Sequence, residues 1–156
     1  MSNIETFRGL IRQVTDFIGA QALDKTLQEK LNQQFPYDGE ICQRIVETCR
    51  TAAQEGWMCQ YEGGGVRYGR VIKPAAELNG YSVDVVDMEN LAGPHHSHPN
   101  GEIDLIMPVS NDARFDGHSQ GWLVYGPDTA HSPTVTQGRA MVLYLLPEGK
   151  IEFTKN

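Results

Sequence analysis

The spacing of apolar residues changes near residue 57, and this change limits the possible folds more than any other feature of the sequence. Before it, apolar side chains recur every three or four residues, as they do along one face of an α-helix. After it, short runs of β-branched and aromatic residues alternate with turns, as they do in antiparallel sheets. The sequence therefore predicts a helical segment over residues 1–56 and a β-structured segment over residues 57–156.

Three helices are predicted in the first segment. The first covers residues 2–20, and its start, Ser-Asn-Ile-Glu, resembles a capping box. The second follows Asp24 and is broken by the Pro-Tyr-Asp-Gly run at 36–39, whereas the third covers residues 40–55 and ends at Gly56. Each helix has an apolar face that needs a partner. The outside of a β-barrel or a second subunit could provide it, and the sequence leaves both open.

Seven runs predict strands in the second segment: WMCQY, VRYGRVI, YSVDVVDM, EIDLIMPV, GWLVYG, SPTVT and AMVLYLL. Turn-forming residues separate them, at EGGG, ELNG, PNG, NDARFDG, GPD, TQG and PEG. Many short strands with tight turns favour a sandwich or barrel over a parallel sheet. We therefore predict a mainly β protein, with a small barrel preceded by the three helices.

Charge and composition exclude several classes of partner. The net charge of −7 argues against a surface that follows phosphates, so we expect no nucleic-acid partner. No apolar run approaches the roughly 20 residues that span a bilayer, and the N-terminus lacks the layout of a signal peptide. The three cysteines, Cys42, Cys49 and Cys59, form no CxxC pair and are expected to be buried thiols. We expect a cytoplasmic protein with no membrane partner.

Three of the five histidines lie in the stretch GPHHSHPNGEIDLIMP, residues 93–108. Alternate residues of a strand share a face, so His96 and His98 point the same way and His95 points the opposite way. Beyond the PNG turn, Glu102 and Asp104 project together from a strand that is otherwise apolar. Burying two carboxyl groups there is costly unless they meet protons or a metal ion. The alternative is a solvated, histidine-rich turn.

These residues resemble the two motifs of the cupin superfamily. The first motif, HxHxxxE, starts at His96, and the second consists of Gly121, Pro127 and His131. The resemblance implies a cupin-type barrel, a double-stranded β-helix or jelly roll, that holds one divalent metal ion. Imidazoles with one carboxylate suit iron, manganese, zinc, nickel or copper. The implied metal ligands are His96, His98, Glu102 and His131.

Other polar and aromatic residues near the motifs are secondary candidates. Asp104 could be a further ligand, a general base, or the acceptor that orients a ligating imidazole. Trp122 and Tyr125 lie on opposite faces of one strand, where each is first a packing residue and either could wall an aromatic pocket. His118 lies in a polar loop and is expected to face solvent.

Longer runs are similar to the 4-hydroxylaminobenzoate lyase family, known from bacterial degradation of 4-nitrobenzoate. The similarity is densest in EGWMCQYEGGGVRYGRVIKP, GPHHSHPNGEIDLIMP, GWLVYGPDTAHSPTV and VLYLLPEGKIEF. It implies a lyase that converts 4-hydroxylaminobenzoate and water into 3,4-dihydroxybenzoate (protocatechuate) and ammonia. Breaking the N–O bond supplies the oxidising equivalents, so neither nicotinamide nor flavin is expected. Glu102 and Asp104 are the candidates for moving protons.

The carboxylate of such a substrate needs a local cation in an acidic protein. The run VRYGRVIKP contains Arg67, Arg70 and Lys73, and strand parity places Arg70 on the same face as Tyr68. We therefore predict that Arg70 grips the carboxylate with a bidentate fork and that Tyr68 forms an aromatic wall. The alternative is that these cations are solvated charges that blunt an edge strand.

Three other functions use the same barrel. A metal-dependent dioxygenase of an aromatic substrate would consume oxygen, a ligand-binding cupin would show no turnover, and a metal-free cupin would resist chelators. The family resemblance favours the lyase, acting on a small aromatic acid. A homodimer is expected because cupins are often dimers.

Overall fold

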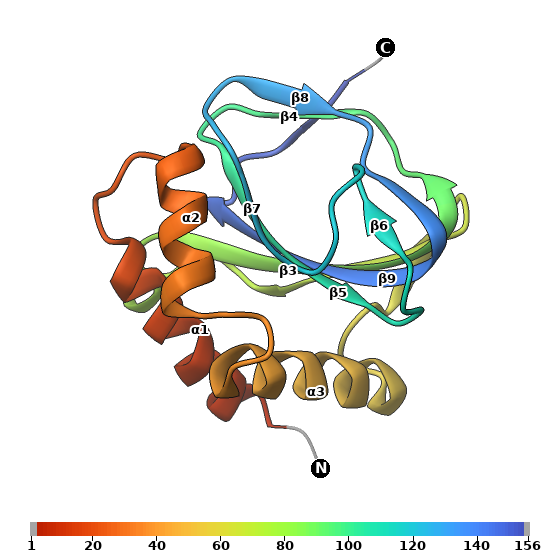
Figure 1. The fold of residues 1–156 in the computed structure, drawn as a ribbon, viewed down its shortest axis with the longest axis horizontal. Helices are drawn as coiled ribbons and strands as arrows, with labels where there is room; N and C mark the ends of the chain where they lie inside the picture. Colours follow the sequence, from red (N-terminus) through yellow and green to blue (C-terminus); the bar gives the residue numbers. More distant parts are fainter. Residues whose placement is uncertain (1–2, 155–156) are drawn as a thin grey trace.

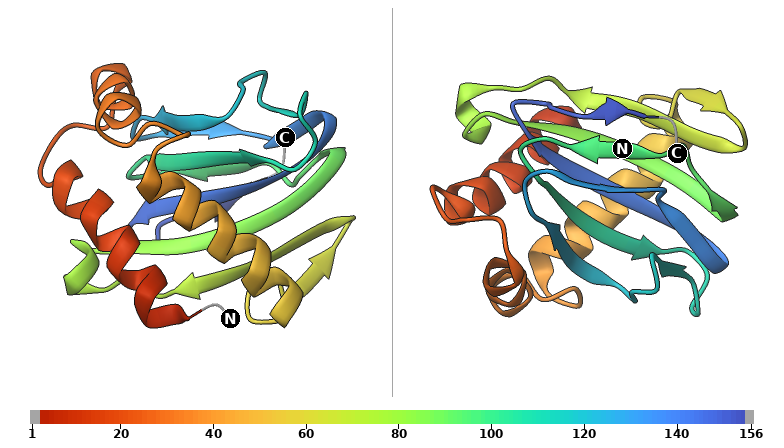
Figure 2. Two further views of the ribbon diagram at one scale, coloured as in Figure 1. Left: turned by 60° about the horizontal axis from the view of Figure 1, so that its bottom comes forward. Right: turned by 90° about the horizontal axis from the view of Figure 1, so that it is seen from above.

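The computed structural model describes residues 3–154, in which a large and a small antiparallel sheet face each other (Figure 1). The three helices lie outside the large sheet (Figure 2). This arrangement confirms the predicted mainly β fold with a three-helix N-terminal segment. The elements are α1 (Ile4–Ile18), α2 (Lys25–Gln34), α3 (Glu40–Glu55), β1 (Tyr61–Gly63), β2 (Val66–Ile72), a 3₁₀ turn (Ala76–Leu78), β3 (Tyr81–Ala92), β4 (His96–His98), β5 (Glu102–Pro108), β6 (Arg114–Phe115), β7 (Gly121–Tyr125), β8 (Thr129–His131), β9 (Thr134–Pro147) and β10 (Glu152–Phe153).

Local signals account for the helix boundaries. The Asn3 side chain caps α1 by accepting hydrogen bonds from the Glu5 and Thr6 amides, whereas Ser2 of the predicted capping box lies outside the described residues. Asp24 caps α2, and Gly56 ends α3 with φ of 91°. Among residues 3–154, no helix is long and apolar enough to cross a membrane.

The large sheet has the strand order β1-β2-β3-β9-β5-β7, with β6 paired to β9, and the small sheet has the order β10-β4-β8. Two of the predicted strand boundaries are wrong. The expected turn at TQG lies inside the continuous strand β9, because a bulge there absorbs the positive φ angles of Gln137 and Gly138. In the run WMCQY, only Tyr61 belongs to a strand, and the preceding residues form the connection from α3.

Both faces of the large sheet are buried along β5 and along most of β3 and β9. On β5, the side chains of Ile103, Leu105 and Met107 pack in the same core as the helices. The intervening Glu102 and Asp104 point to the opposite face, towards the small sheet, and are fully buried. The helices therefore find their partner on the outside of the barrel within the same chain, which settles the alternative that the sequence left open.

Candidate metal centre

Three short segments bring the predicted metal ligands together. His96 and His98 lie on β4, which pairs with β8 so that His96 is opposite His131. Glu102 begins β5 directly after a tight turn at Gly101, whose φ is 91°. A Cβ atom at Gly101 would lie 2.8 Å from the Tyr125 carbonyl oxygen, so the turn needs both the positive φ and the missing side chain.

The ligand atoms of these four residues converge. The Nε2 atoms of His96 and His98 each lie 3.4 Å from Oε1 of Glu102. The Nε2 atom of His131 lies 3.7 Å from the other carboxylate oxygen of Glu102 and 3.2 Å from Nε2 of His96. One ligand atom from each residue falls within 4.8 Å of all the others. Three imidazoles and one carboxylate thus surround a single point.

Unpartnered polar atoms test whether this group suits a metal ion. Buried polar atoms normally have hydrogen-bond partners. In the part of the chain that the structure describes, Nε2 of His98 and both carboxylate oxygens of Glu102 are buried without one. All three can offer lone pairs, and a divalent cation among the four side chains would satisfy them. The donor set therefore fits a metal ion of the kind that imidazole and carboxylate prefer.

Hydrogen bonds outside the cluster orient two of the imidazoles. The Thr129 hydroxyl donates to the Gly126 carbonyl at 2.7 Å, so it accepts from Nδ1 of His98 at 2.9 Å. The Asp116 carboxylate accepts from Nδ1 of His131 at 2.6 Å. When each ring is neutral, the proton on Nδ1 leaves the Nε2 lone pair available to a cation.

Asp116 is a site residue that the sequence did not reveal. Its carboxylate also accepts hydrogen bonds from the Tyr125 hydroxyl at 2.5 Å and from the Thr134 amide at 2.9 Å. In the sequence it belongs to an Asp-Gly pair, which signals only a turn, and its φ of 50° is consistent with that turn. The turn places the carboxylate behind His131.

Burial and neighbouring charges separate the pKa values of the cluster. Burial alone would raise the pKa of Glu102, but the adjacent imidazoles of His131 and His96 outweigh it and lower the pKa to about 2. Burial would lower the pKa of His131, but its hydrogen bond to Asp116 and the adjacent Glu102 carboxylate raise the pKa to about 9. Burial lowers the pKa of His98 to about 4, which keeps that imidazole neutral, the form that ligates metals. Burial and the charge of Glu102 raise the pKa of Asp104 well above its usual range.

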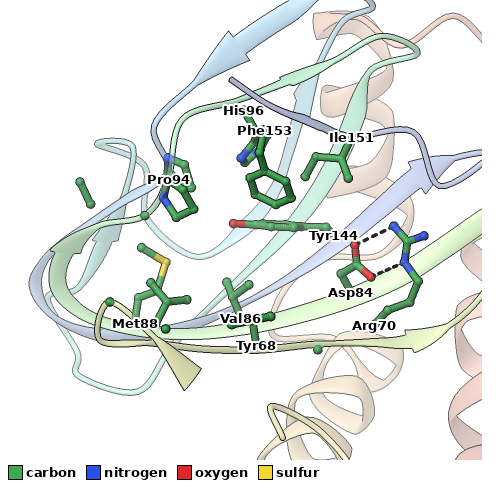
Figure 3. A pocket seen from close by; sticks show the side chains of 17 residues that line it. Tyr68, Arg70, Asp84, Val86, Met88, Pro94, His96, Tyr144, Ile151 and Phe153 are labelled. Atoms are coloured by element: carbon green, nitrogen blue, oxygen red, sulfur yellow. Dashed lines mark hydrogen bonds and ion pairs between the residues drawn. The ribbon is translucent and has the colours of Figure 1, made fainter. Parts of the chain in front are cut away.

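A cavity of about 770 Å³ lies between the two sheets beside the cluster (Figure 3). Side chains of the large sheet form one wall, and residues around β4 and β10 form the other. His96 lines this cavity and also belongs to the cluster, so it joins the two. The residues that line the cavity include Tyr68, Arg70, Asp84, His96, Tyr144 and Phe153.

Arg70 and Tyr68 line the cavity as predicted neighbours on β2. Arg70 is held there by Asp84, with Nε bonded to Oδ1 at 2.8 Å and Nη2 to Oδ2 at 3.2 Å. Nη2 also donates to the Gly149 carbonyl. The bidentate edge of the guanidinium is thus occupied, and only Nη1 is left for a ligand. A bidentate grip on a carboxylate would need Asp84 or Gly149 to release Nη2.

The remaining predicted residues lie in different places. Trp122 packs in the core between the large sheet and the helices, where its indole donates to the Phe35 carbonyl at 3.0 Å, and it does not line the cavity. The Tyr125 ring lies 4.6 Å from the His131 ring, centroid to centroid, and therefore flanks the metal cluster. Asp104 is fully buried near Glu102, and neither of its oxygens has a hydrogen-bond partner among residues 3–154.

Comparisons with known proteins identify a sequence family and a similar solved structure. A family model described as 4-hydroxylaminobenzoate lyase matches residues 9–153. Two proteins of that name are each 29% identical to the chain: one from Nocardioides sp. covers 81% of this chain and 80% of its own length, and one from Pseudomonas putida covers 92% and 93%. Among solved structures, an RmlC-like cupin protein from Ralstonia eutropha is similar with a TM-score of 0.48 and 14% identity, over 64% of this chain and 67% of that one.

Proposed function

The chain belongs to the 4-hydroxylaminobenzoate lyase family, and from that membership we propose that it converts 4-hydroxylaminobenzoate and water into 3,4-dihydroxybenzoate and ammonia. One observation supports this function above all others. The buried group of three histidines and one glutamate adjoins a cavity with aromatic walls, and His96 belongs to both. A small aromatic acid in that cavity would have its reacting group beside the cluster.

We propose that His96, His98, Glu102 and His131 hold a divalent metal ion. When bound, such an ion supplies Lewis acidity towards an oxygen ligand and lowers the pKa of bound water. Thr129 and Asp116 hold two of the imidazoles in the tautomer that this role needs.

The other residues bind the substrate and manage its protons. The overall reaction balances without an external oxidant, because the nitrogen is reduced as the N–O bond breaks and the ring carbon that gains oxygen is oxidised. Glu102 and Asp104, buried side by side, would accept the proton of the water that attacks the ring and return it to the departing hydroxyl, which leaves as water. A second water would then replace the nitrogen on the ring, so that ammonia leaves and one water is consumed overall. Nη1 of Arg70 would attract the carboxylate. Tyr68 and Phe153 would cover the ring and exclude water.

The proposed function is tested by measuring ammonia release from 4-hydroxylaminobenzoate together with the metal content of the purified protein. We expect turnover in the wild type and loss of both bound metal and turnover in His96→Ala. His118→Ala is the matched control, because His118 is exposed and lies outside the cluster, and it should keep both. Equal metal content in the wild type and His96→Ala would contradict the ligand assignment. Oxygen uptake without ammonia would indicate a dioxygenase instead.

A further inference from the structure

The Tyr144 hydroxyl is a buried polar group that the proposed reaction has not yet used. Tyr144 lies on β9, and only 4% of its surface is exposed. Among the residues that the structure describes, its hydroxyl has no hydrogen-bond partner. The side chain lines the cavity between the two sheets. A buried hydroxyl normally has a partner, because losing its water without compensation is unfavourable.

Tyr144 lies between the Arg70–Asp84 pair and the His96 ring. On the large sheet, Tyr144 pairs with Asp104 on one side and with Asp84 on the other, and Asp84 pairs with Arg70. Arg70 is thus two strands away from Tyr144, on the order of 10 Å between backbones. Figure 3 shows the Tyr144 ring across the middle of the cavity, with its hydroxyl pointing away from the Arg70–Asp84 pair. The His96 ring lies 6.2 Å from the Tyr144 ring, centroid to centroid.

From this juxtaposition we infer that Tyr144 determines specificity, because its hydroxyl binds the polar group opposite the carboxylate on a para-substituted benzoate. If the carboxylate of a benzoate contacts Arg70, its para substituent points away from the Arg70–Asp84 pair. The Tyr144 hydroxyl points away from that pair too, whereas a meta substituent would point to one side. The identity of the substrate rests on the proposed function: in 4-hydroxylaminobenzoate, the group bound by Tyr144 is the hydroxylamino group, whose oxygen accepts the phenolic hydrogen bond.

Equilibrium binding tests this inference without turnover. The probes are 4-hydroxybenzoate and 4-methylbenzoate, which match in shape but differ in whether the para group can form a hydrogen bond. By calorimetry on the metal-loaded full chain, the wild type should bind 4-hydroxybenzoate about 2- to 10-fold more tightly, the range expected for one hydrogen bond. Tyr144→Phe should lose this preference while its dissociation constant for 4-methylbenzoate changes less than about 2-fold.

Tyr81→Phe is the matched control, because Tyr81 is a buried tyrosine on the helix side of the sheet and does not line the cavity. It should keep the wild-type preference. An unchanged preference in Tyr144→Phe, or an equal loss of affinity for both probes, would overturn the inference. Ammonia release by the wild type tests the proposed function separately: a protein that discriminates between the probes but releases no ammonia would keep the para-group site and lose the lyase assignment.

Discussion

At the scale of single residues, the candidate metal cluster depends on partners that lie outside it. Asp116 accepts hydrogen bonds from His131, Tyr125 and the Thr134 amide. One carboxylate therefore holds the tautomer of a ligand and the position of the ring beside it. Such partners change metal affinity even though they do not touch the metal ion.

Asp116→Ala should weaken metal binding by about 10- to 100-fold, because His131 would lose the acceptor that fixes its Nδ1 proton. The measurement is a competition titration with a chromophoric chelator. Asp112→Ala removes an exposed acidic residue from the same β5–β7 connection, on the other side of β6, and should leave the affinity unchanged. An equal loss in both variants would mean that only the net charge of the loop matters.

At the scale of elements, α2 completes the exposed edge of β7. The Asn32 side chain accepts a hydrogen bond from the Trp122 amide at 2.9 Å and donates to the Trp122 carbonyl at 3.0 Å. Gln28, one turn earlier, accepts from the Val124 amide. A Cβ atom at Gly121 would lie 2.8 Å from Oδ1 of Asn32, so the glycine makes room for this contact. Two side-chain amides thus take the place of a neighbouring strand and protect the edge from other chains.

Asn32→Ala should lower the free energy of unfolding by about 1–3 kcal/mol, because it leaves the amide and the carbonyl of Trp122 without partners. Urea unfolding followed by circular dichroism measures the change. Gln33→Ala, at an exposed position of the same helix, should change stability by less than about 0.5 kcal/mol. If both variants unfold at the same urea concentration, the amide contacts contribute nothing to stability.

At the scale of the whole molecule, one hydrophobic core joins the helices to the outer face of the large sheet. This core contains all three cysteines, which are free and buried. The predicted division at residue 56 stays a prediction, because a shared core does not show that either part folds alone. The predicted homodimer also stays a prediction.

The thiols report whether the helices stay docked. Burial raises the pKa of Cys42 to about 11 and that of Cys59 to about 12, and it also raises the pKa of Cys49. At pH 8 this leaves at most on the order of one thiol in a thousand as the reactive thiolate. The native protein should therefore show no fast reaction with a disulfide reagent, and the urea-unfolded protein should show three reactive thiols. Rapid labelling of the native protein would show that the helices undock.

Periodicity and strand parity were sufficient for much of the fold. They depend on neighbours within a few residues, so the three helices, most strands and the shared face of Glu102 and Asp104 were predictable. That this face is buried was shown only by the structure. The bulge inside β9 was not, because a glycine with positive φ looks the same in a turn and in a bulge. Asn3 was missed as the α1 cap because it stands next to the equally suitable Ser2.

For the site, the sequence by itself determined the candidate ligands, through its resemblance to the two cupin motifs: His96, His98, Glu102 and His131. The structure brings their ligand atoms together. Only the tertiary structure decided what surrounds them. In the folded chain Asp116 binds Nδ1 of His131, and Asp84 binds the guanidinium edge of Arg70. Trp122 packs in the core between the large sheet and the helices. The tertiary structure also left the buried Tyr144 hydroxyl without a hydrogen-bond partner among residues 3–154, on a side chain that lines the cavity. These outcomes depend on pairs of residues between 14 and 87 positions apart. Their partners are set by sheet register and packing, which no local pattern in the sequence records.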